Sequence, residues 1–324
     1  MSDERKKVLV FRELPPDQLA RLQAAHDVTV ANPRHAEQKA AFDAALANAE
    51  GLIGSSYPVD EALLAGAPRL KVISSISVGV DNYDLAGLRQ RGIMLCHTPG
   101  VLTETTADTV FSLIIAASRR LVELANLVRE GRWKANIGED LFGWDVHGKT
   151  LGILGFGRIG QALARRAALG FDMPVLYHDR SPVEVPSLAG RASYVAFDEL
   201  LQRSDIVAVV LPLTEHTRGL MGPREFARMK QGAIFVNGAR GAIVQEPALL
   251  HALDSGHLRA AALDVFATEP LPLQSPLRTH AKVTCLPHIG SATHETRHAM
   301  AELATTNLLQ ALAGQKPPAV YEQD

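Results

Sequence analysis

The sequence has few cysteines, no long apolar run and little net charge, and each shortage excludes a class of protein. Only Cys96 and Cys285 are present among 324 residues. They lie far apart and form no CxxC motif, which argues against a disulfide framework and against a thiolate metal site. Hydrophobic residues make up 47% and charged residues 21% of the chain, so it has the composition of an ordinary globular protein.

The charge and hydropathy patterns also limit the expected partners and location. A net charge of −2 gives no reason to expect nucleic acid or an anionic membrane as a partner. The longest apolar stretches fall short of the roughly 18 residues of a membrane span, and the charged start MSDERKK lacks the apolar core of a secretory signal. We therefore expect a cytoplasmic protein without a membrane-spanning helix.

The pattern along the chain predicts an α/β protein with parallel sheets. Short β-branched runs alternate with amphipathic stretches, which is typical of βαβ units. These runs are KVLVF from Lys7, DVTV from Asp27, GLIGS from Gly51, KVISSIS from Lys71, IMLCH from Ile93, TLGILG from Thr150, PVLYH from Pro174, DIVAVVL from Asp205, GAIFVN from Gly232, LRAAALDVF from Leu258 and KVTCL from Lys282. The stretch 103–130 has no strand pattern and predicts one helix, capped by Thr103. The residues alone suggest two contiguous halves divided at this helix, and the length suits two domains.

The stretch GWDVHGKTLGILGFGRIG, from Gly143 to Gly160, contains two phosphate-binding patterns. GWDVHGKT fits the P-loop spacing G-x-x-x-x-G-K-[ST], which would indicate phosphoryl transfer. A P-loop needs a strand before it and a helix directly after its Lys-Thr. Here no strand pattern precedes Gly143, and a strand follows Lys149, so we interpret this part as a turn that leads into a strand.

GFGRIG fits the dinucleotide spacing G-x-G-x-x-G and has the surroundings that this motif needs. A strand pattern precedes Gly155, and an amphipathic helix pattern follows. Gly155 suits the tight turn, Gly157 a close approach of a pyrophosphate, and Gly160 close packing of the helix on the strand. Phe156, Arg158 and Ile159 complete the predicted cofactor-binding loop. The sequence therefore predicts a dinucleotide cofactor.

Asp179 and Arg180 leave the choice between NADH and NADPH open. Asp179 ends the next strand pattern, nineteen residues after Gly160, where a carboxylate can bind the ribose hydroxyls of NAD. Arg180 could instead hold the 2′-phosphate of NADP, or it could be a solvated turn residue. We expect NADPH, NADH or both as cofactor.

HETRH, from His294 to His298, matches the zinc motif H-E-x-x-H, with two histidines one helical turn apart. A catalytic zinc needs a third ligand, and Ala304 stands where a metzincin would have its third histidine. A distant glutamate ligand is an alternative. We expect no metal, and interpret the histidines as polar residues on a helix.

Three stretches in the second half contain candidates for the chemistry: NGARG around Arg240, DVFATEP around Glu269 and PHIGSAT around His288. Arg240 and His288 each follow a predicted strand, and ligands of doubly wound sheets bind beyond the carboxyl ends of strands. The planar guanidinium of Arg240 suits a carboxylate. Taken singly, a structural ion pair is the better interpretation of Arg240, and a structural role is the better interpretation of His288.

Together these stretches resemble the D-2-hydroxyacid dehydrogenase family. GFGRIG, NGARG, DVFATEP and PHIGSAT occur in the family's order along the whole chain. More narrowly, ISVGVDNYD, HTPGVLTETTADT and PHIGSATHETR resemble the bacterial glyoxylate/hydroxypyruvate reductases, which are also called 2-ketogluconate reductases. The resemblance implies reduction of small 2-keto acids (glyoxylate, hydroxypyruvate or 2-ketogluconate) by NAD(P)H.

The resemblance also implies site residues. Arg240, Glu269 and His288 would be the catalytic set: His288 protonates the developing oxyanion, Glu269 orients and charges the imidazole, and Arg240 anchors the substrate carboxylate. In addition, the backbone around Val78 and Gly79 would bind the substrate carboxylate, Asp264 would contact the nicotinamide carboxamide, and Pro212 would lie beside the cofactor. Gly79 could also be only a turn residue, and Asp264 only a cap at a strand end.

The domain arrangement of the family overrides the two contiguous halves that the residues alone suggest. It implies a flavodoxin-like substrate domain of residues 1–101 plus 288–324, a Rossmann cofactor domain of residues 102–287 inserted into it, an active site in the cleft between them, and a homodimer formed through the helix from Thr103. Some relatives are dinucleotide-sensing corepressors with the same catalytic residues. That alternative, the preferred 2-keto acid and a contribution of the partner subunit to the pocket remain open.

Overall fold

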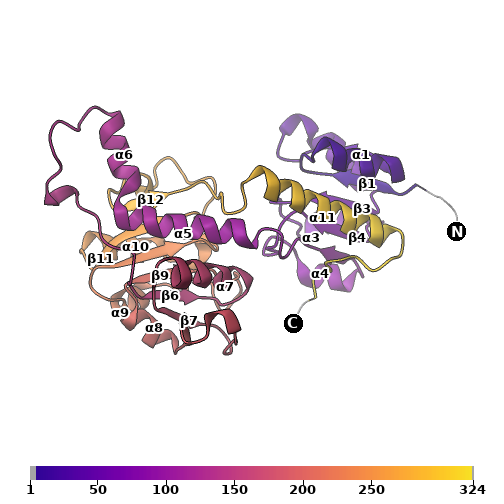
Figure 1. Cartoon of the computed structure of the whole chain (residues 1–324). Helices are drawn as coiled ribbons and strands as arrows, with labels where there is room; N and C mark the ends of the chain where they lie inside the picture. The colour runs from indigo at the N-terminus through magenta and orange to yellow at the C-terminus, as the bar shows by residue number, and fades with distance from the viewer. Residues whose placement is uncertain (1–4, 323–324) are drawn as a thin grey trace. The chain divides into compact units, whose positions relative to one another are not determined.

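The computed structural model describes residues 5–322, which divide into two compact units (Figure 1). The first unit comprises residues 5–102 and 292–322, and the second comprises residues 103–291. The second unit is thus an insertion in the first, as the family resemblance implies. The boundary differs from the expected one by a few residues, because residues 288–291 belong to the second unit. There the backbone N–H groups of Ile289 and Gly290 bond to Asp264.

The first unit contains a five-stranded parallel sheet in the order β2-β1-β3-β4-β5. Its strands are β1 (Lys7–Val10), β2 (Asp27–Val30), β3 (Gly51–Gly54), β4 (Val72–Ser75) and β5 (Met94–Cys96). Every residue of β3 and β4 is buried, as expected for central strands covered on both faces. The strand order is that of flavodoxin-like folds, which confirms the predicted fold of this unit.

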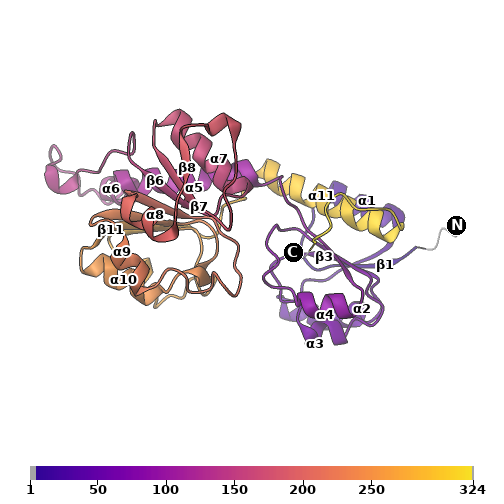
Figure 2. The same cartoon turned by 90° about the horizontal axis from the view of Figure 1, so that it is seen from below.

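Helices cover both faces of this sheet (Figure 2). Helices α1 (Pro16–Ala25) and α11 (His294–Leu312) lie on one face, and α2 (Lys39–Leu46), α3 (Glu61–Ala65) and α4 (Leu85–Gln90) lie on the other. The last helix packs directly on the sheet: a Cβ added to Gly51 would lie 3.0 Å from the Leu308 side chain. Helix α11 therefore completes the core of a unit whose strands lie some 200 residues earlier in the chain.

The second unit contains a seven-stranded parallel sheet in the order β12-β11-β10-β9-β6-β7-β8. Its strands are β6 (Leu151–Leu154), β7 (Val175–His178), β8 (Ala192–Tyr194), β9 (Ile206–Val209), β10 (Ala233–Asn237), β11 (Leu258–Leu263) and β12 (Val283–Cys285). The strand order reverses between β6 and β9, which is the switch point of a Rossmann fold and confirms the predicted cofactor fold. Strand β8 was not predicted; it is an edge strand with two exposed residues.

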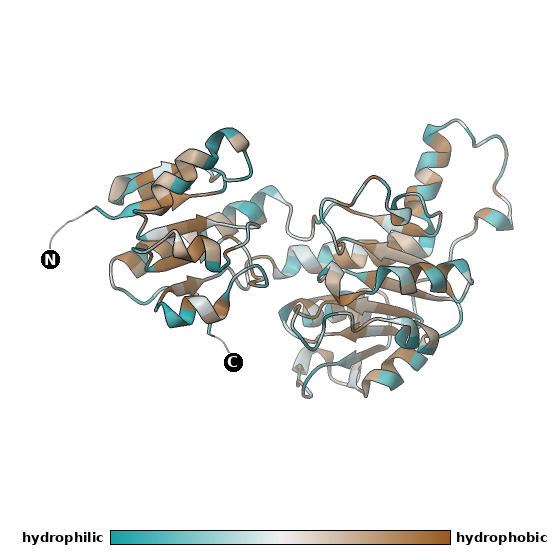
Figure 3. Ribbon diagram, turned by 180° about the vertical axis from the view of Figure 1, so that it is seen from behind, coloured by the Kyte–Doolittle hydropathy of each residue, from teal (hydrophilic) through white to brown (hydrophobic). Residues whose placement is uncertain are grey.

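Apolar layers on both sides hold this second sheet. Helices α5 (Thr103–Arg119) and α7 (Arg158–Arg165) cover one face, and α8 (Phe197–Arg203), α9 (Pro223–Arg228) and α10 (Glu246–Asp254) cover the other. Figure 3 shows the apolar strands between helices with polar outer surfaces. Short helical turns occur at Ala36–Gln38, Glu139–Leu141, Arg166–Gly170, Pro186–Leu188, Gly241–Ile243 and Pro276–Arg278.

The single helix predicted for 103–130 is in fact two helices. Helix α5 ends at Arg119, Arg120 has a left-handed backbone with φ 54°, and α6 (Leu121–Arg129) follows in a new direction (Figure 1). Thr103 is the first helical residue rather than the cap. The Arg120 guanidinium bonds to both oxygens of Glu123, at 2.7 and 2.8 Å, which stabilises the start of α6. Nothing in residue 120 itself signals the break.

Within residues 5–322, no helix is both long and apolar enough to cross a membrane.

Candidate active site

The site residues predicted in the second unit all follow strands of its sheet. Asp179 follows β7, Pro212 follows β9, and Arg240 follows β10, while Asp264 and Glu269 follow β11. Gly155 follows β6, and His288 follows β12. Because all seven strands are parallel, these residues lie together beyond the carboxyl ends of the strands, where doubly wound folds bind ligands.

The glycine loop has the geometry that a dinucleotide requires. Gly155 has φ 97°, a conformation that side-chain-bearing residues rarely adopt. A Cβ on Gly160 would lie 2.1 Å from the Gly155 carbonyl oxygen, so only glycine allows α7 to pack this close. No atom lies within 4 Å of the position of a Cβ on Gly157, which precedes the first turn of α7. The open face at Gly157 and the N–H groups of Arg158 and Ile159 form a cradle that fits a pyrophosphate.

Asp179 is already bonded to the glycine loop. Its Oδ2 accepts a hydrogen bond from the Phe156 N–H at 2.6 Å, and its Oδ1 accepts one from the Arg180 N–H at 2.7 Å. The Phe156 ring stacks on Tyr177 of β7, with ring centroids 3.7 Å apart. The acid therefore links the end of β7 to the loop, while its carboxylate stays half-exposed.

His288 and Glu269 form a hydrogen-bonded pair. His288 Nδ1 lies 2.7 Å from Glu269 Oε2, and Glu269 Oε1 accepts a hydrogen bond from the Phe266 N–H at 3.0 Å. Burial alone would raise the pKa of Glu269. The hydrogen bonds from His288 and Phe266 and the charges of His288 and Arg240 outweigh burial, and the pKa is lowered. Glu269 is thus held as an anion, and Nε2 of His288 is directed away from it.

Arg240 lies close enough to this pair to lower the pKa of Glu269 through its charge. Its backbone is fixed by Asn237, whose side chain accepts from the Ala239 N–H at 3.1 Å and donates to the Arg240 carbonyl at 3.0 Å. A Cβ on Gly241 would lie 1.8 Å from the Phe266 carbonyl carbon. Glycine at 241 therefore lets the Arg240 loop touch the loop that carries Glu269.

Asp264 binds the backbone of the His288 loop. Its side chain is buried, and its Oδ1 and Oδ2 accept hydrogen bonds from the Ile289 and Gly290 N–H groups at 2.7 and 2.8 Å. Burial raises the pKa of Asp264, against the two backbone hydrogen bonds that lower it. His288 itself has φ 54°, a strained backbone for a residue with a side chain. The contacts of Asp264 favour a positioning role over the expected contact with the nicotinamide.

The predicted substrate segment lies in the first unit. Val78 and Gly79 are half-exposed and follow β4, again at the carboxyl edge of their sheet. The Val78 carbonyl oxygen lies 3.2 Å from His97 Nδ1. In the second unit, Pro212 is exposed, and its carbonyl accepts a hydrogen bond from the Thr217 hydroxyl at 2.7 Å.

The two alternative motifs take part in ordinary structure. Lys149 lies two residues before β6, and no helix begins there, so the P-loop pattern is a turn. His298 of the HETRH motif lies 3.4 Å from Asp17 on α1. In the described part of the chain, no group of three or more His, Cys, Asp or Glu side chains could hold a metal ion.

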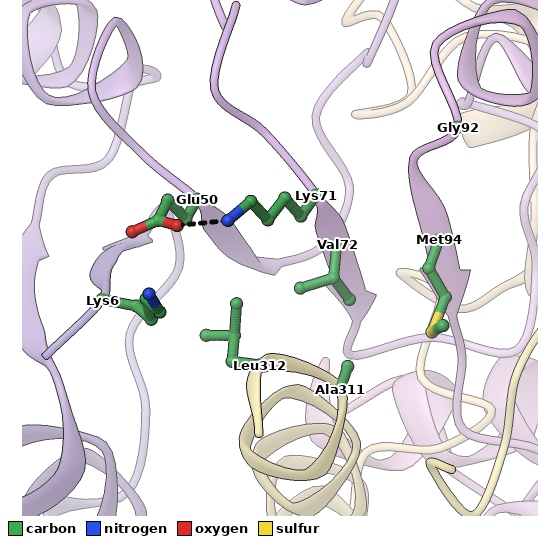
Figure 4. Close-up of a pocket in the computed structure, with 8 residues that line it drawn as sticks. All are labelled: Lys6, Glu50, Lys71, Val72, Gly92, Met94, Ala311 and Leu312. Atoms are coloured by element: carbon green, nitrogen blue, oxygen red, sulfur yellow. Dashed lines mark hydrogen bonds and ion pairs between the residues drawn. The ribbon is translucent and has the colours of Figure 1, made fainter. Parts of the chain in front are cut away.

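A small cavity lies at the opposite edge of the first sheet (Figure 4). It has a volume of about 220 Å³, and its lining includes Lys6, Glu50, Lys71 and Leu312. Lys71 Nζ pairs with Glu50 Oε2 at 2.7 Å across it. Lys6, Glu50 and Lys71 directly precede β1, β3 and β4, so this cavity is remote from Val78 and Gly79, which follow β4.

Sequence reasoning missed the residues that support the site. Asn237 and Gly241 fix the Arg240 loop, and both lie in or beside the recognised stretch NGARG. An asparagine at the end of a buried strand is a turn-forming residue, and this was the available signal. The bonds from Asp264 to residues 289 and 290 connect segments about 25 residues apart, and no local pattern indicates them.

Comparison with known proteins agrees with this geometry. Residues 111–290 match the family model described as D-isomer specific 2-hydroxyacid dehydrogenase, NAD binding domain. The chain is 52% identical, over 96% of both chains, to a protein of Escherichia fergusonii named glyoxylate/hydroxypyruvate reductase B. It is 50% identical, over 96% of both chains, to the protein of that name in Escherichia coli strain SMS-3-5.

Solved structures share the whole fold. The chain matches a protein of Thermus thermophilus with a TM-score of 0.89 and 44% identity, over 97% of this chain and 99% of that one. It also matches an NADPH-dependent glyoxylate/hydroxypyruvate reductase of Sinorhizobium meliloti, solved with NADP and malonate, with a TM-score of 0.88, 29% identity and coverage of 98% and 97%. The chain is therefore an NAD(P)-dependent oxidoreductase that belongs to the D-isomer specific 2-hydroxyacid dehydrogenase family.

Proposed function

We propose that this protein reduces the 2-keto acids glyoxylate, hydroxypyruvate and 2-ketogluconate to D-2-hydroxy acids, with NADPH or NADH as the reductant. The observation that carries this proposal is the 2.7 Å contact between His288 Nδ1 and Glu269 Oε2, with Arg240 near enough to act on Glu269. The names of the relatives support the choice of glyoxylate and hydroxypyruvate. The sequence resemblance alone supports 2-ketogluconate.

The cradle at Gly155, Gly157 and Gly160 fits a dinucleotide, and Arg158 and Ile159 would offer their N–H groups to its pyrophosphate. When bound, the reduced nicotinamide supplies the hydride that adds to C2 of the keto acid. Asp179 and Arg180 would face the adenosine ribose, and Pro212 would lie along the cofactor. The pattern of backbone donors needs no side-chain charge, so both cofactors can use the same loop.

His288 would supply the proton. Because Nδ1 is held by Glu269, Nε2 is the nitrogen that can face a substrate. Hydride addition leaves negative charge on the keto oxygen, and the proton moves from Nε2 to that oxygen as the charge develops. The ionised Glu269 fixes the orientation of the ring through its bond to Nδ1.

Arg240 would bind the substrate carboxylate through its planar guanidinium and polarise the neighbouring carbonyl. The backbone of Val78 and Gly79 would donate to the same carboxylate. Asp264, with both oxygens occupied by backbone N–H groups, would act as a positioning residue for the His288 loop. The expected contact with the nicotinamide carboxamide stays the alternative role for Asp264.

The test is a steady-state comparison of the three keto acids with NADPH and NADH, followed through loss of the reduced-nicotinamide absorbance. Turnover of at least one keto acid is expected; hydroxypyruvate and 2-ketogluconate should give D products, whereas glycolate, the product of glyoxylate, is achiral. Tight cofactor binding without turnover of any of them would overturn the proposal in favour of a dinucleotide-sensing corepressor. Asp179→Ser should improve kcat/KM for NADPH relative to NADH, because the carboxylate repels a 2′-phosphate.

We also propose a homodimer. No residue of α6 is buried, and large apolar side chains are exposed on it and on the segment that follows. These side chains are Leu121, Val122, Val128, Trp133, Ile137, Phe142 and Trp144. A patch of this kind in a water-exposed position usually marks an interface, and a second copy would cover it.

Light scattering during gel filtration tests the homodimer. We expect the mass of two chains for the wild type and a monomer for Val128→Asp with Trp133→Ser. A monomeric wild type would contradict the proposal. The cytoplasmic location stays a prediction, which cell fractionation can test.

A further inference from the structure

Three arginines gather at the carboxyl edge of the first sheet. Arg12 follows β1, Arg34 follows β2, and Arg297 lies in the first turns of α11. Helix α11 runs from this edge toward the other one, since its last residue, Leu312, lines the cavity at the amino edge. We call Arg12, Arg34 and Arg297 the arginine cluster. Arg297 is far from the other two in the sequence, so no sequence motif reveals the cluster.

Two serines after β3 hold the cluster in place. Arg12 Nη1 donates to Ser55 Oγ at 2.5 Å and to Ser56 Oγ at 3.1 Å. Arg34 donates from Nη2 to the Ser56 carbonyl oxygen. Ser55 is buried, and Ser56 has a left-handed backbone with φ 60°. The serines are neutral, so they orient the guanidinium groups without neutralising them.

The positive charge of the cluster is not compensated by the chain. Arg12 and Arg297 are half-buried, and across residues 5–322 none of the three arginines forms an ion pair with a carboxylate. This includes Glu13 and Glu295, which are close in sequence. Arg297 makes no side-chain hydrogen bond within the same residues. Burial and the charges of Arg297 and Arg34 lower the pKa of Arg12, and burial lowers that of Arg297. Partly buried like charges are costly unless an anion joins them.

The cluster shares its edge with the proposed substrate segment. Val78 and Gly79 follow β4, which is the neighbour of β3, and β1 is the next strand beyond β3. Neighbouring strands lie about 4.8 Å apart, so the ends of β4 and β1 are about 10 Å apart. A small molecule whose keto-carboxylate end lies at Val78 and Gly79 could present its other end to the long side chains of the cluster.

We propose that the arginine cluster binds a second anionic group, a carboxylate or a phosphate, at the far end of the 2-keto acid. This inference rests on the proposed reductase function and extends its substrate class to keto acids that carry a second anionic group. Several guanidinium groups with free N–H donors suit the oxygens of either anion. Ser55 and Ser56 fix the donors before the ligand binds.

Matched substrate pairs test the proposal. The first pair is 2-oxopentanoate and 2-oxoglutarate, which differ by a terminal carboxylate; the second is hydroxypyruvate and its 3-phosphate ester. For the wild type, we expect kcat/KM to be at least about tenfold higher for the member of each pair that carries the additional anionic group, the difference expected for one or two charge-assisted hydrogen bonds. The pair with the larger ratio identifies carboxylate or phosphate as the preferred group.

Variants test whether a preference for the more highly charged substrate depends on the arginine cluster. Arg297→Gln and Arg34→Gln should each bring the dianion-to-monoanion ratio close to one, mainly through KM. Arg34 is exposed, so its replacement should not disturb folding. Arg21→Gln is the matched control: it removes an exposed arginine of α1 that bonds to Gln18 and Thr306, and it should keep the wild-type ratio. Equal ratios in the wild type and both cluster variants would overturn the proposal.

The remaining outcomes separate this inference from the reductase function. Turnover of monoanionic keto acids with no preference for dianions would overturn the inference and leave the function intact. If no keto acid is reduced, inorganic phosphate serves as the probe in thermal unfolding. A phosphate-dependent rise in Tm that is present in the wild type and absent in Arg297→Gln would support the anion site without the function. No such difference would overturn the site.

Discussion

Asp264 Oδ1 accepts a hydrogen bond from the backbone N–H of Ile289 at 2.7 Å, so a buried carboxylate at the end of one strand fixes the residue directly after His288. The second oxygen accepts from Gly290 at 2.8 Å. His288 is thus held at two points. Glu269 bonds to its ring, and Asp264 bonds to the backbone of the two residues that follow it. This double support explains how a residue with φ 54° is kept in one position.

Asp264→Asn should slow turnover without preventing cofactor binding. The amide has only one acceptor oxygen, so its NH₂ group would face one of the two backbone N–H donors. We expect kcat to fall about 10- to 100-fold, in line with the effect of other buried supporting residues. Nicotinamide fluorescence should give a Kd for the reduced cofactor within about threefold of the wild type. A large rise in that Kd, with kcat unchanged, would restore the nicotinamide contact.

Glu269→Gln should change the pH profile as well as the rate. The lowered pKa of Glu269 keeps it ionised at and above its ordinary value of 4.5, so the pairing is lost only as the pH falls below that value. In the variant this carboxylate is absent, so the fall in kcat/KM below pH 4.5 that protonation of Glu269 causes in the wild type should disappear. The maximum should fall about 100-fold. A variant profile that superimposes on that of the wild type after scaling would argue against the pairing.

Gly157→Ala should separate cofactor binding from folding. No atom lies within 4 Å of the added Cβ, so the unfolding midpoint should stay near that of the wild type. A bound pyrophosphate would occupy this space, so we expect the Kd for the reduced cofactor to rise at least about tenfold.

Gly170→Ala is the control, because its added Cβ is equally free and lies at the far end of the helical segment. Gly160→Ala should instead destabilise the fold by about 1–3 kcal/mol, because its Cβ would lie 2.1 Å from the Gly155 oxygen. Unchanged cofactor binding by Gly157→Ala would remove the loop from the cofactor site.

Asp205→Asn should weaken the second unit in a pH-dependent way. Asp205 accepts hydrogen bonds from Lys230 Nζ at 2.8 Å and from the Thr150 N–H at 2.9 Å. Burial raises the pKa of Asp205, but these bonds outweigh it, and the pKa is lowered from 3.8. A lowered folded-state pKa stabilises the fold above the unfolded value and loses that effect as the pH falls through the folded value.

Urea unfolding should therefore show a cost of about 1 kcal/mol for Asp205→Asn at pH 7, since the side chain is partly exposed. The difference from the wild type should shrink below pH 3.8. Glu130→Gln, which removes an exposed ion pair with Arg132, is the control and should show no measurable change. A constant difference from pH 7 to pH 3 would exclude the ionised carboxylate as the cause.

Much of the fold follows from local patterns. Buried strands such as β3, β6 and β10 are continuous apolar runs, and Gly155 and Gly160 are glycines because of backbone constraints that a short motif records. The order of the strands in each sheet could be predicted only from the family resemblance. The edge strand β8 was missed because its exposed residues carry no apolar pattern.

The supporting parts of the site depend on contacts distant in sequence. Asp264 bonds to Ile289 only because the second sheet brings separate strand ends together. Arg12 feels the charge of Arg297 only because α11 packs on the first sheet. The break at Arg120 is similar: an arginine has no preference for a left-handed backbone, and its bond to Glu123 becomes visible only in three dimensions. Sequence patterns thus indicated which residue types do chemistry, and the structure indicates what holds them.

The most direct test of the account is kcat/KM for hydroxypyruvate in His288→Ala, with the Kd for the reduced cofactor measured on the same sample. The account predicts a loss of about 10²- to 10⁴-fold in kcat/KM, the usual contribution of a general acid, with cofactor binding within about threefold of the wild type. A variant that keeps kcat/KM within about tenfold of the wild type would contradict the assignment of His288 as the proton donor.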